Sequence, residues 1–213
     1  MSIGLLLFWI APATAYRRGA RRHLQAHFPD KSDQVWRSTR AWQSRLAPKR
    51  PRHSGSAVVD FEMRYVEWSC ALYRAVQEHG MSQAEAAVLV ETIMTDLYRP
   101  VPAVMFKFSR LRSANREARV RWILGNVTGR FLPAPPFYYR HLPSETGVAW
   151  DVTVCPFADY FKDQGVPELA GPAACNLDHC MAREWGIELV RTQTIADGAA
   201  YCDFRWKFPA ATA

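Results

Sequence analysis

Four cysteines in the C-terminal third of the chain have side chains that can do chemistry. Cys155 closes an apolar run and is followed directly by Pro156, and Cys175, Cys180 and Cys202 come later in the sequence. A thiolate is a nucleophile, and the start of a helix favours it through free backbone N–H groups and the helix dipole. Because a strand is predicted to end at Cys155 and a helix to begin at Pro156, a lowered pKa is expected for the Cys155 thiol.

A carboxylate stands close to these thiols on the next predicted helix. Cys175, Asp178 and His179 are three and four positions apart, so they share one side of that helix. Asp178 is the only acid in the otherwise apolar segment AACNLDHCMA. A carboxylate in such surroundings must either reach water or have a partner.

Structural interpretations compete with the chemical ones. A cysteine in an apolar strand or helix is more often a small core residue than a nucleophile, and Cys70 fits that description fully. A core thiol is also the main alternative for Cys155, and His179 on a helix surface is more often solvated than a ligand. No Cys-x-x-Cys pair is present, so no metal site is predicted.

The elements that must position these residues follow from periodicity. Apolar residues at spacings of three and four predict helices over residues 61–80, 82–99, 103–112 and 115–131. Gly80 is in the place of a C-terminal cap, and Ser82 with Glu85 forms the pattern of a capping box.

The pattern changes after residue 136. Strands are predicted at residues 137–142 and 148–155, a short helix at 157–165, a longer helix at 167–186, and strands at 187–195 and 200–208. Ile187, Leu189 and Arg191 share one face of the third strand. The fold class is therefore α+β, with N-terminal helices followed by a ββααββ unit that forms an antiparallel sheet.

The charge divides the chain in two. Residues 1–59 carry eleven basic and two acidic residues, whereas residues 60–213 carry sixteen and eighteen. Residues 46–57, rich in proline, basic residues and serine, read as a linker. We therefore expect a basic helical and linker segment at 1–57 and an α+β domain at 58–213. Without a nucleic-acid-binding motif in the acidic part, no nucleic-acid partner is predicted.

The first residues allow two interpretations. Residues 3–15 form an apolar run that is followed by arginines, which is the reverse of a secretory signal and too short to span a bilayer. A plain N-terminal helix is favoured. A peripheral membrane contact through residues 3–22, with Phe8 and Trp9 in lipid, is the alternative. Five cysteines without a disulfide framework predict free thiols and a cytoplasmic protein, in the alternative case at the inner face of a membrane.

The order of motifs over residues 152–208 resembles the L-2-amino-thiazoline-4-carboxylic acid hydrolase family. The family pattern runs Cys-Pro, an aromatic-rich short helix, Pro-Glu-Leu, Cys-x-x-Asp, an Arg-Thr strand and a final Cys-Asp-Phe, and each element is present here in that order. The resemblance covers about residues 137–208, with weaker similarity from about residue 60, and does not include residues 1–50.

The resemblance implies a hydrolase that acts on a cyclic amidine. In the reaction that names the family, water adds at C2 of an aminothiazoline ring and the C–S bond opens, which gives an N-carbamoyl cysteine. The chemistry needs a nucleophile or an activated water, an acid, and a cation for the substrate carboxylate.

This sequence offers a candidate for most of these roles. Cys155 is the candidate nucleophile, Asp178 the general base or the partner of the amidinium, and Arg191 the clamp for the substrate carboxylate. The other candidates for the substrate pocket are Cys175, His179 and Cys202. No glycine-rich phosphate loop is present, so no nucleotide cofactor is predicted, and the sequence leaves the oligomeric state open.

A second interpretation is a binding module without catalysis. Helices followed by a ββααββ unit with cysteines are also similar to 4-vinyl reductase-type domains and to vesicle-tethering subunits, which bind small or lipid-like ligands or partner proteins. A polar pocket with a low-pKa thiol favours the enzyme, whereas cysteines packed in the core favour the binding module.

Overall fold

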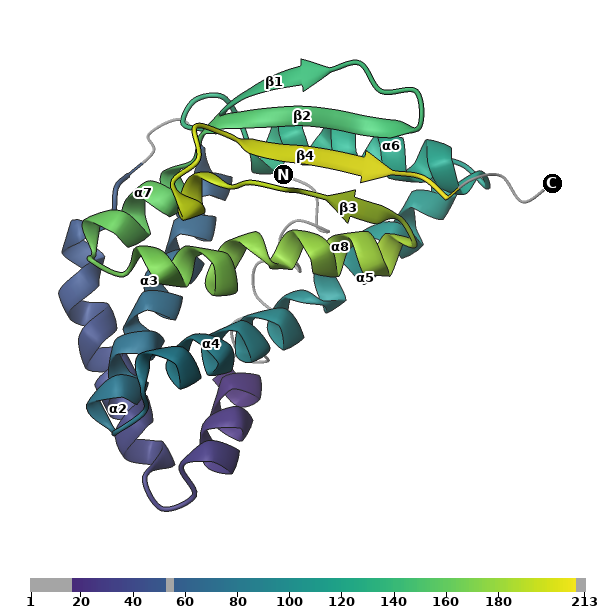
Figure 1. Ribbon diagram of the computed structural model, residues 1–213. Coiled ribbons are helices and arrows are strands. Elements are labelled where there is room, and N and C mark those ends of the chain that lie inside the picture. The colour runs from purple at the N-terminus through teal and green to yellow at the C-terminus, as the bar shows by residue number, and fades with distance from the viewer. Residues whose placement is uncertain (1–16, 53–55, 210–213) are drawn as a thin grey trace.

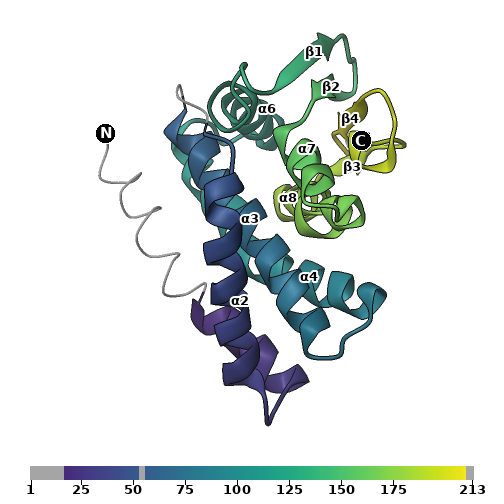
Figure 2. The same cartoon turned by 90° about the vertical axis from the view of Figure 1, so that its left-hand side faces the viewer.

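Helices on one side of a small antiparallel sheet form the molecule, and the predicted α+β class is confirmed. The computed structural model describes residues 17–52 and 56–209. Figure 1 shows the sheet with its order β1-β2-β4-β3. Figure 2 shows α6, α7 and α8 between the sheet and the long helices α2 and α3. One face of the sheet is therefore covered by helices.

The elements follow the predicted order. Residues 17–27 are helical, and the named helices are α2 (Ser32–Leu46), α3 (Ala57–Glu78), α4 (Gln83–Tyr98), α5 (Pro100–Phe108), α6 (Arg116–Asn126), α7 (Pro156–Asp163) and α8 (Leu177–Trp185). Short helical turns are η1 (Ala47–Lys49), η2 (Ser109–Leu111), η3 (Val127–Phe131), η4 (Pro167–Leu169), η5 (Gly171–Cys175) and η6 (Ile195–Asp197). The strands are β1 (Tyr138–Leu142), β2 (Gly147–Val154), β3 (Glu188–Val190) and β4 (Cys202–Lys207).

Local signals set the helix ends where the sequence predicts them. The Ser82 and Glu85 side chains form a complete capping box at the start of α4. Gly80 and Gly186 have φ angles of 101° and 66° just beyond α3 and α8, and glycine adopts such angles without steric cost.

Two apolar clusters make the core. The first joins α2, α3, α4 and α7, and the second joins α6 and α8 to the inner face of the sheet. Trp150, Phe204 and Trp206 line that inner face, with ring centroids 5.7–6.0 Å apart. The Cys155 side chain packs against both clusters, so it lies at the seam between them.

Two predicted elements are shorter or less regular than expected. The strand predicted at 187–195 ends at Val190, so Arg191 lies beyond it. The helix predicted at 167–186 is divided into η4, η5 and α8. Pro172 has no N–H group to continue a regular helix, and η5 is a π-helical turn at this point.

The helices near the N-terminus share the first core cluster. Ala20, Leu24 and Val35 are fully buried beside α3 residues. Arg50 forms an ion pair of 2.5 Å with Glu67, whose side chain is 1% exposed. Residues 3–16, including Phe8 and Trp9, lie outside the described residues. No helix in residues 17–52 and 56–209 is long and apolar enough to cross a membrane.

The division of the chain at residue 57 stays a prediction, and limited proteolysis tests it. The first cuts are expected between residues 46 and 57, and residues 58–213 should remain folded by circular dichroism. Because α2 packs on α3, this fragment should be less stable than the full chain. Protection of residues 1–50 together with unfolding of the rest on their removal would show that the division is wrong.

Candidate functional site

A buried ion pair lies at the centre of the candidate site. An Arg191 Nη1–H group donates to Asp178 Oδ2 over 2.7 Å, and the two side chains are 4% and 23% exposed. Arg191 Nη2 also donates to the carbonyl oxygen of Cys175 at 3.0 Å. The Arg191 guanidinium lies 5.2 Å from the centre of the Phe204 ring, so a cation–π contact covers one of its faces.

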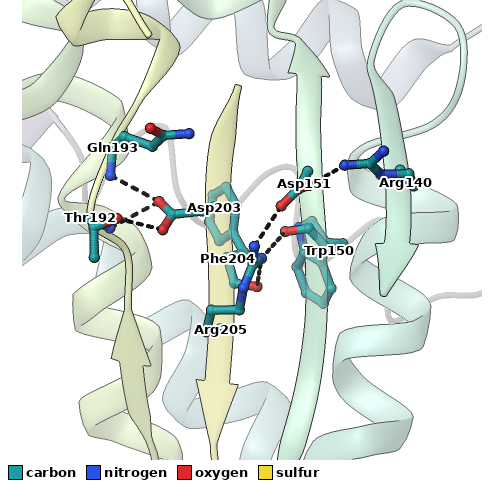
Figure 3. A network of polar contacts seen from close by, with 8 residues as sticks. All are labelled: Arg140, Trp150, Asp151, Thr192, Gln193, Asp203, Phe204 and Arg205. Carbon is teal, nitrogen blue, oxygen red and sulfur yellow. Dashed lines mark hydrogen bonds and ion pairs between the residues drawn. The ribbon is translucent and has the colours of Figure 1, made fainter. Parts of the chain in front are cut away.

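The segment after Arg191 is held by one side chain of β4. The Asp203 carboxylate accepts hydrogen bonds from the backbone N–H groups of Thr192 and Gln193 and from the Thr192 hydroxyl, at 2.7–2.9 Å (Figure 3). Partial burial alone would raise the pKa of Asp203, but these hydrogen bonds lower it below its ordinary value. The Asp203 carboxylate thus binds the backbone N–H groups that follow β3, and the strand itself ends at Val190.

A second polar group stabilises the same outer face of the sheet. Asp151 lies opposite Asp203 in the register of β2 and β4, and is 2% exposed. Its two oxygens accept from Arg140 and Arg205, each at 2.8 Å (Figure 3). Burial would raise the pKa of Asp151, but the two guanidiniums lower it, so it stays ionised. Asp151 is balanced by two guanidiniums and Asp203 is stabilised by hydrogen bonds, so the two aspartates can face one another across the strands.

The charges of the ion pair act on the thiols of Cys175 and Cys202, and Cys155 interacts electrostatically with both of these cysteines. The pKa of the Cys175 thiol is raised by burial and further by Cys155, Asp178 and Cys202, and is lowered by Arg191. Cys180, by contrast, is buried on α8, where Arg183, Glu184 and Arg99 are its charged neighbours.

The expected lowering of the Cys155 pKa is wrong. Burial raises the pKa of Cys155 to about 12, and the backbone N–H groups of Ala158 and Phe157 at the start of α7 oppose the rise only in part. Burial also raises the pKa of Cys202, whose sulfur accepts a hydrogen bond from the Ile195 N–H at 3.2 Å. The thiols are therefore neutral near pH 7 in this conformation.

Asp178 and His179 titrate closer to neutrality. Burial raises the pKa of Asp178 to about 6, although Arg191 acts to lower it. The pKa of the half-buried His179 is lowered by burial and then by the charges of Arg191 and Arg183, so its imidazole is neutral at pH 7. Asp178 is therefore ionised at pH 7 with a pKa close enough to neutrality to accept a proton.

One buried acid that acts on the same tyrosine as Asp178 is not predicted from the sequence. Glu62 Oε2 on α3 is buried without a hydrogen-bond partner in the described residues, and burial raises the pKa of Glu62 well above its ordinary value. The Tyr98 hydroxyl, which donates to Met181 Sδ at 3.1 Å, has its pKa raised by burial and then by Asp178 and Glu62. Tyr98 therefore lies within electrostatic reach of both carboxyl groups.

The only sequence signal for Glu62 is its place on the helix. It falls between Phe61 and Met63 at the start of α3, where a charged residue reads as part of the solvated face. Within residues 17–52 and 56–209, no group of three or more His, Cys, Asp or Glu side chains is arranged to hold a metal ion.

Comparisons with known proteins identify one family. The family model described as L-2-amino-thiazoline-4-carboxylic acid hydrolase matches residues 61–206, which is more than half of the chain. The search of curated proteins and the search of solved structures each found no match. The matched region holds every candidate site residue named above, including Glu62 and Tyr98.

The pH dependence of stability tests the environment of Asp178. A folded-state pKa of about 6, above the ordinary 3.8, means that the folded protein holds this proton more tightly than the unfolded chain. The resulting stabilisation is present below about pH 4 and is lost as the pH rises through about 6. Asp178→Asn should remove this contribution, which has a slope of at most about 1.4 kcal/mol per pH unit.

Urea unfolding of the wild type and the variant between about pH 4 and pH 7 measures the difference. The exposed Asp163 at the end of α7 provides the control, and Asp163→Asn should keep the wild-type slope. An Asp178→Asn variant with the same slope as the wild type would contradict the raised pKa.

Proposed function

The chain belongs to the L-2-amino-thiazoline-4-carboxylic acid hydrolase family, and we propose that it hydrolyses a cyclic amidine that carries a carboxylate. The family name supports hydrolase activity in general. For this chain we propose 2-amino-thiazoline-4-carboxylate or a close analogue as substrate and an N-carbamoyl amino acid as product. The observation that carries the proposal is the buried Asp178–Arg191 pair within the matched region.

In this proposal Arg191 binds the substrate carboxylate. A guanidinium can bind a carboxylate through two parallel N–H groups, and Arg191 already binds one in Asp178. The substrate carboxylate takes the place of Asp178, and the hydrogen bond to the Cys175 carbonyl keeps the guanidinium in position. In this proposal the neutral thiols of Cys175 and Cys202 and the neutral imidazole of His179 contact the substrate without adding charge.

Asp178, once released, acts as the general base. It takes a proton from a water molecule whose oxygen attacks C2 of the ring, and it passes this proton to the ring nitrogen. With a pKa of about 6, the Asp178 carboxylate is ionised at pH 7 and is still basic enough to accept a proton.

Glu62 is the proposed proton donor for the leaving sulfur. Its raised pKa keeps the carboxyl group protonated where an ordinary glutamate would be ionised. As the C–S bond breaks, the leaving sulfur receives the Glu62 proton, and the proton of the C2 hydroxyl returns to Glu62 as the carbonyl group forms. Water thus supplies the carbonyl oxygen, one proton on nitrogen and one on sulfur. In this proposal the Tyr98 hydroxyl, which donates to Met181 Sδ in the structure, donates instead to the intermediate.

Attack by the Cys155 thiol is the alternative route through the same site. It would form a covalent intermediate at C2, which water then hydrolyses. A pKa of about 12 leaves very little thiolate at pH 7, so activation of water by Asp178 is the favoured route.

The raised thiol pKa values favour a second candidate function as well. Cys155, Cys175 and Cys202 are all desolvated, as expected of thiols that pack in a core. A module that binds a small ligand without turning it over would need no thiolate. The five cysteines are free, which suits a cytoplasmic protein of either kind.

Substitution of the two candidate catalytic residues separates these possibilities. Asp178→Asn removes the base and should lower kcat for 2-amino-thiazoline-4-carboxylate by about 10²–10⁴-fold, whereas Cys155→Ser should keep most of the rate. Loss of turnover in Cys155→Ser instead would assign the nucleophile to the thiol. Cys70→Ala is the control. It changes a buried thiol of α3 that is not part of the proposed site, and its kcat should equal that of the wild type.

Circular dichroism must show that each variant is folded before the rates are compared. Near-normal rates in both Asp178→Asn and Cys155→Ser would remove this site from the proposal. Absence of wild-type turnover, together with tight binding of the same compound, would support the binding module.

Glu62→Gln tests the proton donor. The amide cannot donate the proton, so kcat should fall by about 10²-fold or more. A donor works only when protonated, so the wild-type rate should decline as the pH rises through the raised pKa of Glu62. The variant should lack this decline. Glu78→Gln, on an exposed residue of the same helix, is the matched control, and a wild-type rate and pH profile in Glu62→Gln would exclude the role.

A further inference from the structure

An exposed apolar stripe crosses the junction of α5 and η2. Val104, Phe108 and Leu111 are spaced by four and three positions, so they lie on one side of the helical segment. They are 44%, 65% and 89% exposed. Single exposed apolar residues are ordinary, but three in one stripe at a projecting turn call for a partner.

Cations flank this stripe without acidic neighbours. Lys107, Arg110 and Arg112 are all exposed, and residues 97–116 contain five basic residues and no acidic one. Across the described parts of the chain, none of these three side chains forms an ion pair with a carboxylate. Their charge is therefore available to an external anion.

A buried arginine fixes the shape of the turn. Arg119 is 6% exposed, donates to the Ser109 hydroxyl at 3.0 Å and to the Phe106 carbonyl, and lies 3.8 Å from the centre of the Phe106 ring. Burial lowers the pKa of Arg119, and the charges of Arg110 and Arg116 lower it further. The turn thus concentrates like charges around a fixed apolar tip, and an external anionic surface would relieve their repulsion.

We propose that the surface formed by residues 104–112 docks on an anionic phospholipid bilayer. Phe108, Leu111 and Val104 would enter the boundary between headgroups and acyl chains, while Lys107, Arg110 and Arg112 contact lipid phosphates. The aliphatic side chains decide between partners, because leucine and valine gain little from nucleic-acid phosphates but gain from burial in acyl chains. The attachment is peripheral and is independent of the proposed hydrolysis.

Vesicle sedimentation of the full chain tests this surface. Wild type should bind vesicles of phosphatidylcholine with phosphatidylglycerol and should bind phosphatidylcholine alone at least about tenfold more weakly. Phe108→Ser/Leu111→Ser should weaken binding to the anionic vesicles by about tenfold or more. Lys107→Gln/Arg110→Gln should weaken it about fivefold for each charge removed, and high salt should release the wild type.

Matched controls place the effect on this surface. Val88 on α4 is 64% exposed, so Val88→Ser removes a comparable apolar side chain elsewhere. Arg37→Gln/Arg40→Gln removes two exposed charges of α2. Residues 3–22 are unchanged in every variant, so their contribution is constant. Circular dichroism must show that each variant is folded.

Three outcomes would overturn the proposal. The first is that wild type does not bind the anionic vesicles. The second is that the α5 variants bind as well as the two controls, which would place any membrane contact elsewhere. The third is binding to a duplex oligonucleotide but not to vesicles, with the same dependence on Lys107 and Arg110.

Discussion

The buried Asp178–Arg191 ion pair is the interaction around which this half of the molecule is organised. A guanidinium that is 4% exposed must find acceptors within the protein, because an unpaired buried charge is strongly destabilising. The chain supplies them from separate segments: a carboxylate on α8, a carbonyl at the end of η5, and the Phe204 ring on β4. The π-helical turn before α8 and the early end of β3 both serve this requirement.

The two faces of β4 have different structural roles. Its inner residues, Phe204 and Trp206, pack with Trp150 and Trp185 and hold α8 against the sheet. Its outer residue Asp203 fixes the backbone after Arg191, so the arginine side chain enters the protein from a rigid segment. A strand of six residues thereby positions both partners of the ion pair.

The sequence predicts those structural features that depend on residues close by in the chain. The capping box at Ser82 and the glycine at position 80 act within a few residues, and both are found as expected. The end of β3 depends on Asp203, more than ten residues away, and alternation of apolar residues cannot reveal it. The pKa of Cys155 is a second example. The helix start at Pro156 is a local signal that lowers this pKa, but burial against two core clusters raises it by more.

The charges of Asp178 and Arg191 determine which charges a ligand must carry in order to separate them. A neutral ligand that separated Asp178 from Arg191 would leave two desolvated charges without partners, at a cost of several kcal/mol. An anion alone would satisfy Arg191 but leave the Asp178 carboxylate unpaired. A compound with both a carboxylate and an amidinium replaces each partner by a group of the same sign. The proposed substrate class has this combination, so in this proposal the charges of the ion pair also select the ligand that separates it.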